Sequence, residues 1–259
     1  MTTTVATPAV ATAAAPSFPR LTLIELRKTV DTRAARWLIA VIVVVPYTVA
    51  ILQILLTKVP EERGFLAAFS AQQGLGLVLL PVLGILCVTS EWSQRTTMTT
   101  YALVPRRRRI VAAKTAAVAV LSLALTAIAL PMAAALNVLA PLVSDSGDQW
   151  DLGLRIVAQA ALVGVLTALG GVAFGLALMS TPLAIVLYFA LPTVLSVVSE
   201  TVSMLHRALW WVDLNVATTA LYTTDITQRE WLQVATSTVV WVVVPFLLGS
   251  ERTVRRDVS

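Results

Sequence analysis

The stretch EWSQRTTMTTYALVPRRRRIVAAK, from Glu91 to Lys114, is the most polar and most basic part of an otherwise apolar chain, and it lies between two apolar runs of membrane-spanning length. Such a stretch belongs in water. Its arginine quartet, Arg106 to Arg109, together with Arg95 and Lys114, indicates the cytosol, because positive residues in short loops resist transfer across a bilayer. The rest of the chain is oriented from this loop.

The composition predicts an all-α, polytopic membrane protein. Of its 259 residues, 58% are hydrophobic and 13% charged, whereas soluble domains average about 45–50% apolar and about 25% charged residues. The apolar runs predict about six spans. We expect them at residues 37–56, 69–89, 115–140, 156–179, 183–198 and 232–248. The net charge of +5 follows the loops and does not indicate a nucleic-acid partner.

The N-terminal region is predicted to contain a tail and one amphipathic helix. Residues 1–19 lack charge and a sustained apolar block, which predicts a disordered tail. Thr22 and Glu25 have the spacing of a capping box, with Leu21 and Leu26 at the positions of a hydrophobic staple, so we expect a helix from Thr22. Its polar face, which includes Glu25, indicates a helix lying in the membrane surface. A cytosolic helix packed on another element is the alternative.

Polar and small residues within the spans make further predictions. Ser70, Gln72 and Gln73 lie near the start of the second span, so either this span begins later or these side chains face protein or a cavity. The fourth span contains glycines that allow close helix packing. They are Gly164, Gly170, Gly171 and Gly175.

The C-terminal part is expected to be less regular. Pro192 is a candidate break in the fifth span, and residues 200–222 predict a short extracytosolic helix, interfacial or re-entrant, with tryptophan anchors. Thr227 and Glu230 form a second capping-box pattern that starts the last helix. We expect that helix to end at Gly249, before a basic cytosolic tail, residues 251–259.

Charge counting favours both termini in the cytosol. The segments assigned to the cytosol hold 14 of the 19 basic residues but only 5 of the 14 acidic ones. Arginine exceeds lysine, 16 against 3, in a chain rich in Ala and Val, which is typical of GC-rich bacterial genomes. We therefore expect a multi-pass protein of the bacterial plasma membrane.

Several function classes are disfavoured by what the chain lacks. The spans carry almost no charge, which disfavours an ion-coupled carrier. There is no G-x-x-x-x-G-K-[ST] motif for a P-loop. His206 has no cysteine or second histidine nearby, so a water-facing structural role is expected for it and no metal site. Cys87 is the single cysteine, predicted to be a buried small hydrophobe. No nucleophile and base occur together, so no enzyme is expected.

Against this background the loop resembles a known family. Ser90-Glu91-Trp92, then Thr96, Pro105, the arginine cluster and Lys114 resemble the cytosolic loop of bacterial ABC transporter permeases of the second, exporter-like type. Glycine is usual before the threonine in that family, where this chain has Arg95. The N-terminal amphipathic helix, the six spans and the elaborated segment before the last span extend the resemblance over most of the chain.

The resemblance implies a transport subunit without an ATPase of its own. The loop would contain a coupling helix that docks on a separate ATP-hydrolysing subunit, which would bind ATP and Mg²⁺. Two permease copies or paralogues would pair and move a lipophilic or amphipathic substrate outward. The implied contact residues are Glu91, Trp92, Arg95 and Thr96.

Other interpretations of the same residues stay open. The four arginines, Arg106, Arg107, Arg108 and Arg109, are typical of a topology anchor or a contact to anionic lipids. Glu91 could act only on a helix dipole. A noncatalytic assembly or sensing subunit is the alternative function. Gln53, Asn137 and Gln159 could line a substrate path or bridge helices.

Overall fold

The computed structural model describes residues 16–56, 64–93, 107–142, 150, 153–221 and 226–255, and among these residues it contains helices and no strand. Six of the helical segments are long and apolar enough to cross a membrane, which confirms the prediction of a multi-pass, all-helical chain. They are α2 (Arg33–Leu56), α3 (Phe65–Ser93), α5 (Arg107–Leu139) with the 3-10 turn η2 (Ala140–Leu142), α6 (Leu154–Leu178), α7 (Thr181–Thr201), and α10 (Gln228–Thr238) continued by the π-helical turn η3 (Val239–Val243) and α11 (Val244–Arg255).

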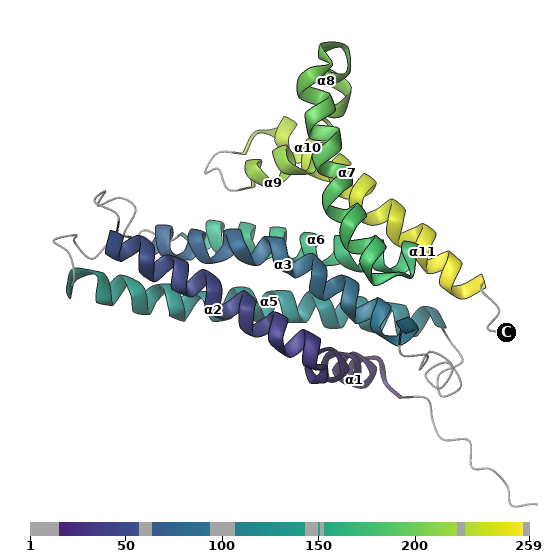
Figure 1. Ribbon diagram of the computed structural model, residues 1–259, viewed down its shortest axis with the longest axis horizontal. Helices are drawn as coiled ribbons and strands as arrows, with labels where there is room; N and C mark the ends of the chain where they lie inside the picture. Colours follow the sequence, from purple (N-terminus) through teal and green to yellow (C-terminus); the bar gives the residue numbers. More distant parts are fainter. Residues whose placement is uncertain are drawn as a thin grey trace, which may run out of the picture.

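Four of these helices, α2, α3, α5 and α6, lie side by side as a bundle, while α7 leads away from it and α11 returns toward the end of α6 (Figure 1). Two clusters of buried apolar side chains run through the bundle, and each draws residues from all four helices. The bundle is therefore the core of the molecule. The helices α7, α9 (Leu214–Ala220) and α10 with η3 pack on its α6 side through two smaller clusters.

Close backbone approach between α3 and α6 depends on glycine, as the glycines of the fourth span predict. A Cβ atom at Gly171 would lie 2.0 Å from the carbonyl oxygen of Pro81. On the facing helix, a Cβ at Gly84 would lie 2.3 Å from the carbonyl oxygen of Ala168. Small residues at such crossings let membrane helices gain van der Waals contact where hydrophobicity gives no driving force.

The helices extend beyond the predicted spans because polar residues at their ends are also helical. The largest difference is at α5, which begins at Arg107, eight residues before the predicted boundary at 115. Within the stretch that sequence alone assigns to a loop, the described residues, 91–93 and 107–114, are therefore all helical. Pro192 lies inside α7 without ending it, so the predicted break is wrong. Neighbouring helices and local adjustment allow proline within membrane helices.

The N-terminal helix α1 (Phe18–Asp31) differs from the prediction in its start and in its buried face. It begins four residues before Thr22, with Ser17 at the N-cap and proline in the first turn, so the Thr22 capping box is wrong. The face turned toward the protein contains Leu21, Glu25 and Thr29. Glu25, predicted on the exposed polar face, is only 3% exposed. This face packs on α5, as the alternative of a helix packed on another element predicts.

The segment before the last span forms two short helices instead of the single one predicted. These are α8 (Ser203–Leu209) and α9 (Leu214–Ala220), separated by a turn that contains Trp210 and Trp211. The capping box of Thr227 and Glu230 at the start of α10 is confirmed, with both reciprocal hydrogen bonds present.

The prediction that the last helix ends at Gly249 is wrong. The helix α11 continues to Arg255, which lies in the predicted tail. A Cβ at Gly249 would lie 2.5 Å from the backbone nitrogen of Ala177, near the end of α6. Glycine therefore serves a close helix crossing here and not a helix end.

Candidate functional site

The residues predicted to contact a partner surround the connection from α3 to α5. Glu91 and Trp92 belong to the last turn of α3, whereas Arg95, Thr96 and Arg106 lie outside the described residues. The remaining arginines of the quartet form the first turn of α5, and they are Arg107, Arg108 and Arg109. Those contact and anchor residues that the structure describes therefore lie at one end of the bundle, where α1 also packs (Figure 1).

A buried ion pair joins α1 to α5 beside this connection. Lys114 Nζ lies 2.6 Å from Glu25 Oε2, and the two side chains are 8% and 4% exposed. Lys114 Nζ also donates to the backbone carbonyl of Cys87 in α3, at 3.3 Å. Lys114 was predicted to belong to a water-exposed loop, and this is wrong because α5 starts earlier and turns its side chain into the protein. One ammonium group thus links three helices.

A second lysine, Lys28, also pairs with Glu25. Lys28, three residues along α1, lies 2.9 Å from Glu25 Oε1 and stays half exposed. Burial alone would raise the pKa of the Glu25 carboxyl, but the charges and hydrogen bonds of Lys114 and Lys28 outweigh it and leave this pKa below its ordinary value. The carboxylate is therefore ionised at neutral pH.

Hydroxyl groups add further ties at the same end. Thr29 Oγ1 in α1 lies 3.2 Å from Cys87 Sγ, which is buried as predicted. Thr89, two residues further along α3, has its hydroxyl 2.7 Å from that of Thr181 at the start of α7. The end of α3 is therefore held by α1, α5 and α7 together.

Two arginines connect the end of the chain to this region. Arg107 Nη1 donates to the carbonyl of Thr253 in α11 at 3.5 Å, and Arg252 Nη1 donates to the carbonyl of Ala177 at the end of α6 at 3.1 Å. Basic side chains at helix C-termini satisfy carbonyls that have no partner within the helix. The described ends of the chain, α1 and α11, consequently lie at the same end of the bundle, as six spans require.

Sequence reasoning missed the Glu25–Lys114 pair because its members are 89 positions apart. A signal was present. Leu21, Glu25 and Thr29 recur at intervals of four and so share one helix face, and Lys114 follows three apolar or small residues and opens a long apolar run. A lysine and a carboxylate at the edges of apolar faces are expected to pair, because burying either alone is costly.

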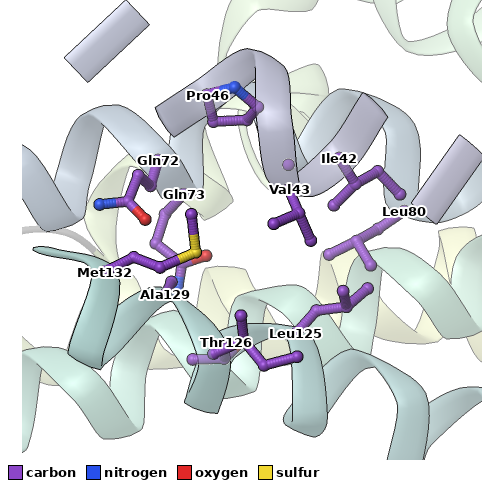
Figure 2. A pocket seen from close by; sticks show the side chains of 12 residues that line it. Ile42, Val43, Pro46, Gln72, Gln73, Leu80, Leu125, Thr126, Ala129 and Met132 are labelled. Carbon is purple, nitrogen blue, oxygen red and sulfur yellow. The ribbon is translucent and has the colours of Figure 1, made fainter. Parts of the chain in front are cut away.

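A small cavity lies inside the bundle between α2, α3 and α5, with a volume of about 30 Å³. Figure 2 shows Gln72, Gln73 and Met132 on one side of it and Ile42, Leu80 and Leu125 on the other. Gln72 donates to the carbonyl of Ala68, while Gln73 Nε2 is buried without a partner among the described residues. This volume suits a water molecule.

The cavity decides between the two alternatives for the polar start of the second span. The helix α3 begins at Phe65, and Gln72 and Gln73 face protein, whereas Ser70 is exposed. Asn137 and Gln159 are also buried within the molecule, at 1% and 6% exposure. Their polar groups are therefore turned away from the lipid-facing surface of the chain.

The single histidine lies far from this region, on α8. His206 Nδ1 is 3.1 Å from the carbonyl oxygen of Ser199, so this nitrogen carries the proton of the hydrogen bond. The ring is exposed, as predicted. Within the described part of the chain no group of three His, Cys, Asp or Glu side chains could hold a metal ion.

Comparisons with known proteins do not identify a family for this chain. No protein-family model matches the chain, and no curated protein matches it. The fold and the composition define a multi-pass helical membrane protein with a charge-paired, many-helix junction at one end.

Proposed function

We propose that the chain is the membrane-spanning permease subunit of an ATP-driven exporter, coupled to a separate ATP-hydrolysing subunit through the segment between α3 and α5. The proposal starts from the resemblance of this segment to the cytosolic loop of exporter-like ABC permeases. The chain itself would bind no nucleotide. ATP and Mg²⁺ would belong to the partner, and the α1 end would face the cytosol of a bacterium.

The observation that carries the proposal is the junction of Glu25, Lys114 and the Cys87 carbonyl at the base of this segment. A partner that pushes on the segment acts on the end of α3 and the start of α5. Because both are tied to α1, and α3 is tied to α7, a displacement there would move several helices as one body. Transport by alternating access needs such rigid coupling.

A second permease copy or a paralogue completes the proposed transporter. The substrate would be lipophilic or amphipathic, because the buried polar side chains of the described bundle residues are uncharged apart from the junction. The cavity shown in Figure 2 is too small for such a substrate, so the proposed path would lie between two copies.

The first test is copurification of the full-length protein from native membranes in mild detergent. We expect a P-loop ATPase to copurify and its hydrolysis rate to change when the permease is present. An ATPase that neither associates with this chain nor responds to it would contradict the proposal. An assembly or sensing subunit would instead keep its function after the segment 94–106 is disrupted.

The second test concerns Glu91, which lies in the last turn of α3. Glu91→Ala should lower transport-coupled ATP hydrolysis several-fold at unchanged abundance in the membrane. The matched control is Glu251→Ala, which removes an exposed carboxylate paired with Arg255 at the same end of the molecule but outside the segment. Equal loss in both variants would remove the role assigned to Glu91.

A further inference from the structure

A basic and aromatic cavity lies at the end of the molecule opposite to α1. His206, Arg207, Trp210 and Arg229 line this open hollow of about 300 Å³. The helix α7 starts beside Thr89 near the α1 end and runs for 21 residues before α8 begins, so the cavity lies a full helix length away from the junction (Figure 1). None of these four residues takes part in the proposed coupling.

The cavity has fixed walls. The carbonyl of Trp210 accepts a hydrogen bond from Gln233 Nε2 at 2.7 Å, and that of Trp211 accepts one from Thr236 Oγ1 at 2.6 Å. These bonds hold the turn after α8 on α10, so Arg229 of α10 stacks over the Trp210 ring at 4.6 Å. Such a contact orients a guanidinium group while its N–H groups stay available.

The two guanidinium groups have no charged partner in the described part of the chain. No carboxylate forms an ion pair with Arg207 or Arg229 there. Two described carboxylates near them in sequence have other contacts: Asp213 accepts from Ser196 at 2.9 Å, and Glu230 closes the capping box of α10. Among the described residues, therefore, no carboxylate pairs with the two guanidinium groups of the cavity, and they can take an anion.

The position of these arginines supports a specific role. They are two of only five basic residues outside the segments assigned to the α1 side of the membrane. Basic residues on the translocated side oppose the usual charge bias, so two of them at one cavity are unlike the general pattern. The helices that carry the two arginines, α8 and α10, also expose apolar side chains. They are Met204, Trp231 and Leu232, at 91%, 45% and 54% exposure.

We propose that this cavity binds the phosphate group of an amphiphile, with Arg207 and Arg229 contacting the phosphate oxygens. Arginine presents several N–H donors in a planar fork that matches phosphate geometry. The exposed apolar side chains would lie along acyl chains, and the tryptophans suit the boundary between headgroups and acyl chains. A phospholipid headgroup is one source of such a phosphate and free phosphate is another. The inference does not depend on coupling to an ATPase.

The test uses the full-length protein in a nonionic detergent that contains no phosphate, with bound ligand counted by native mass spectrometry. The probes are dihexanoyl phosphatidylglycerol, dihexanoyl glycerol, which has the same acyl chains without phosphate, and inorganic phosphate. The double variant Arg207→Gln/Arg229→Gln should bind phosphatidylglycerol about tenfold more weakly, roughly threefold for each exposed charge. Binding of dihexanoyl glycerol should not change.

Two further variants separate charge from packing. Arg155→Gln removes one exposed positive charge at the start of α6 and should change affinity less than about twofold, as expected for a charge that lies outside the site. Arg207→Gln alone leaves the stacking of Arg229 on Trp210 intact and should still weaken phosphatidylglycerol binding about threefold.

The three probes decide the outcome. Displacement of the lipid by millimolar inorganic phosphate would assign free phosphate as a sufficient ligand, and lipid binding without displacement would assign the headgroup. Either result supports the site when the arginine variants reduce binding. Equal binding of both lipids, or unchanged binding in the double variant, would overturn the proposal.

Discussion

The two ends of the molecule differ in whether a basic side chain is buried and paired or faces an open cavity. At the α1 end, Lys114 is buried and neutralised by Glu25, a residue of the same chain. At the α8 end, Arg207 and Arg229 face an open cavity, and the described residues offer them no ion pair. The difference teaches that the buried charge of Lys114 serves the fold itself, whereas the charges of Arg207 and Arg229 stay open to a ligand.

The two ends also differ in how their helices are held. The junction at the α1 end ties side chains of α1, α3 and α5 to one another. The turn after α8 is held mainly through its backbone carbonyls, which accept hydrogen bonds from Gln233, Thr236 and Trp241. Loss of one member should therefore be severe at the junction and modest at the turn.

The largest effect is expected for Lys114→Ala. It leaves the buried Glu25 carboxylate without its closest partner, so we expect the free energy of unfolding to fall by about 3–5 kcal/mol. The double variant Glu25→Leu/Lys114→Met replaces both charges by apolar groups and should retain most of the stability of the wild type. Unfolding in detergent, followed by circular dichroism, gives both values. A single variant no less stable than the double variant would show that the pair is not desolvated.

Acid should weaken the same junction. Because the pKa of Glu25 is lower in the folded protein than its ordinary value of 4.5, its contribution to stability is complete above that value and is lost as pH falls through the lowered folded pKa. We expect the melting temperature of the wild type to fall more steeply below pH 4.5 than that of Glu25→Leu/Lys114→Met. The double variant is the control because it retains every other carboxylate. Parallel pH profiles would contradict the assignment.

The sequence predicts the transmembrane plan well because apolar runs are a local signal. Six spans, the close packing around Gly171 and the capping box at Thr227 all follow from spacing within one segment, and all are confirmed. Helix ends are predicted less well. Hydropathy does not predict the start of α5 at Arg107, because charged residues extend a helix without adding to its apolar run.

The junction could not be predicted as a unit, since it depends on contacts between distant segments. Glu25 has the spacing of a capping residue, but its face of α1 packs on α5, where it pairs with Lys114. Gly249 likewise resembles a helix end until α6 is seen to cross there. In both cases a local rule gives the wrong role because a tertiary contact decides the position.

The smallest effect is expected at the α8 end, for Trp241→Phe. Trp241 Nε1 donates to the carbonyl of Val212 at 2.6 Å, while its ring stacks on Phe174 with centroids 6.2 Å apart. Phenylalanine keeps an aromatic ring in place and loses the hydrogen bond, so we expect a loss of about 1 kcal/mol in the free energy of unfolding. Trp231→Phe is the control, because the Trp231 ring is 45% exposed. A loss for Trp241→Phe as large as that for Lys114→Ala would mean that the turn after α8 is held as firmly as the junction, and the contrast between the two ends would fail.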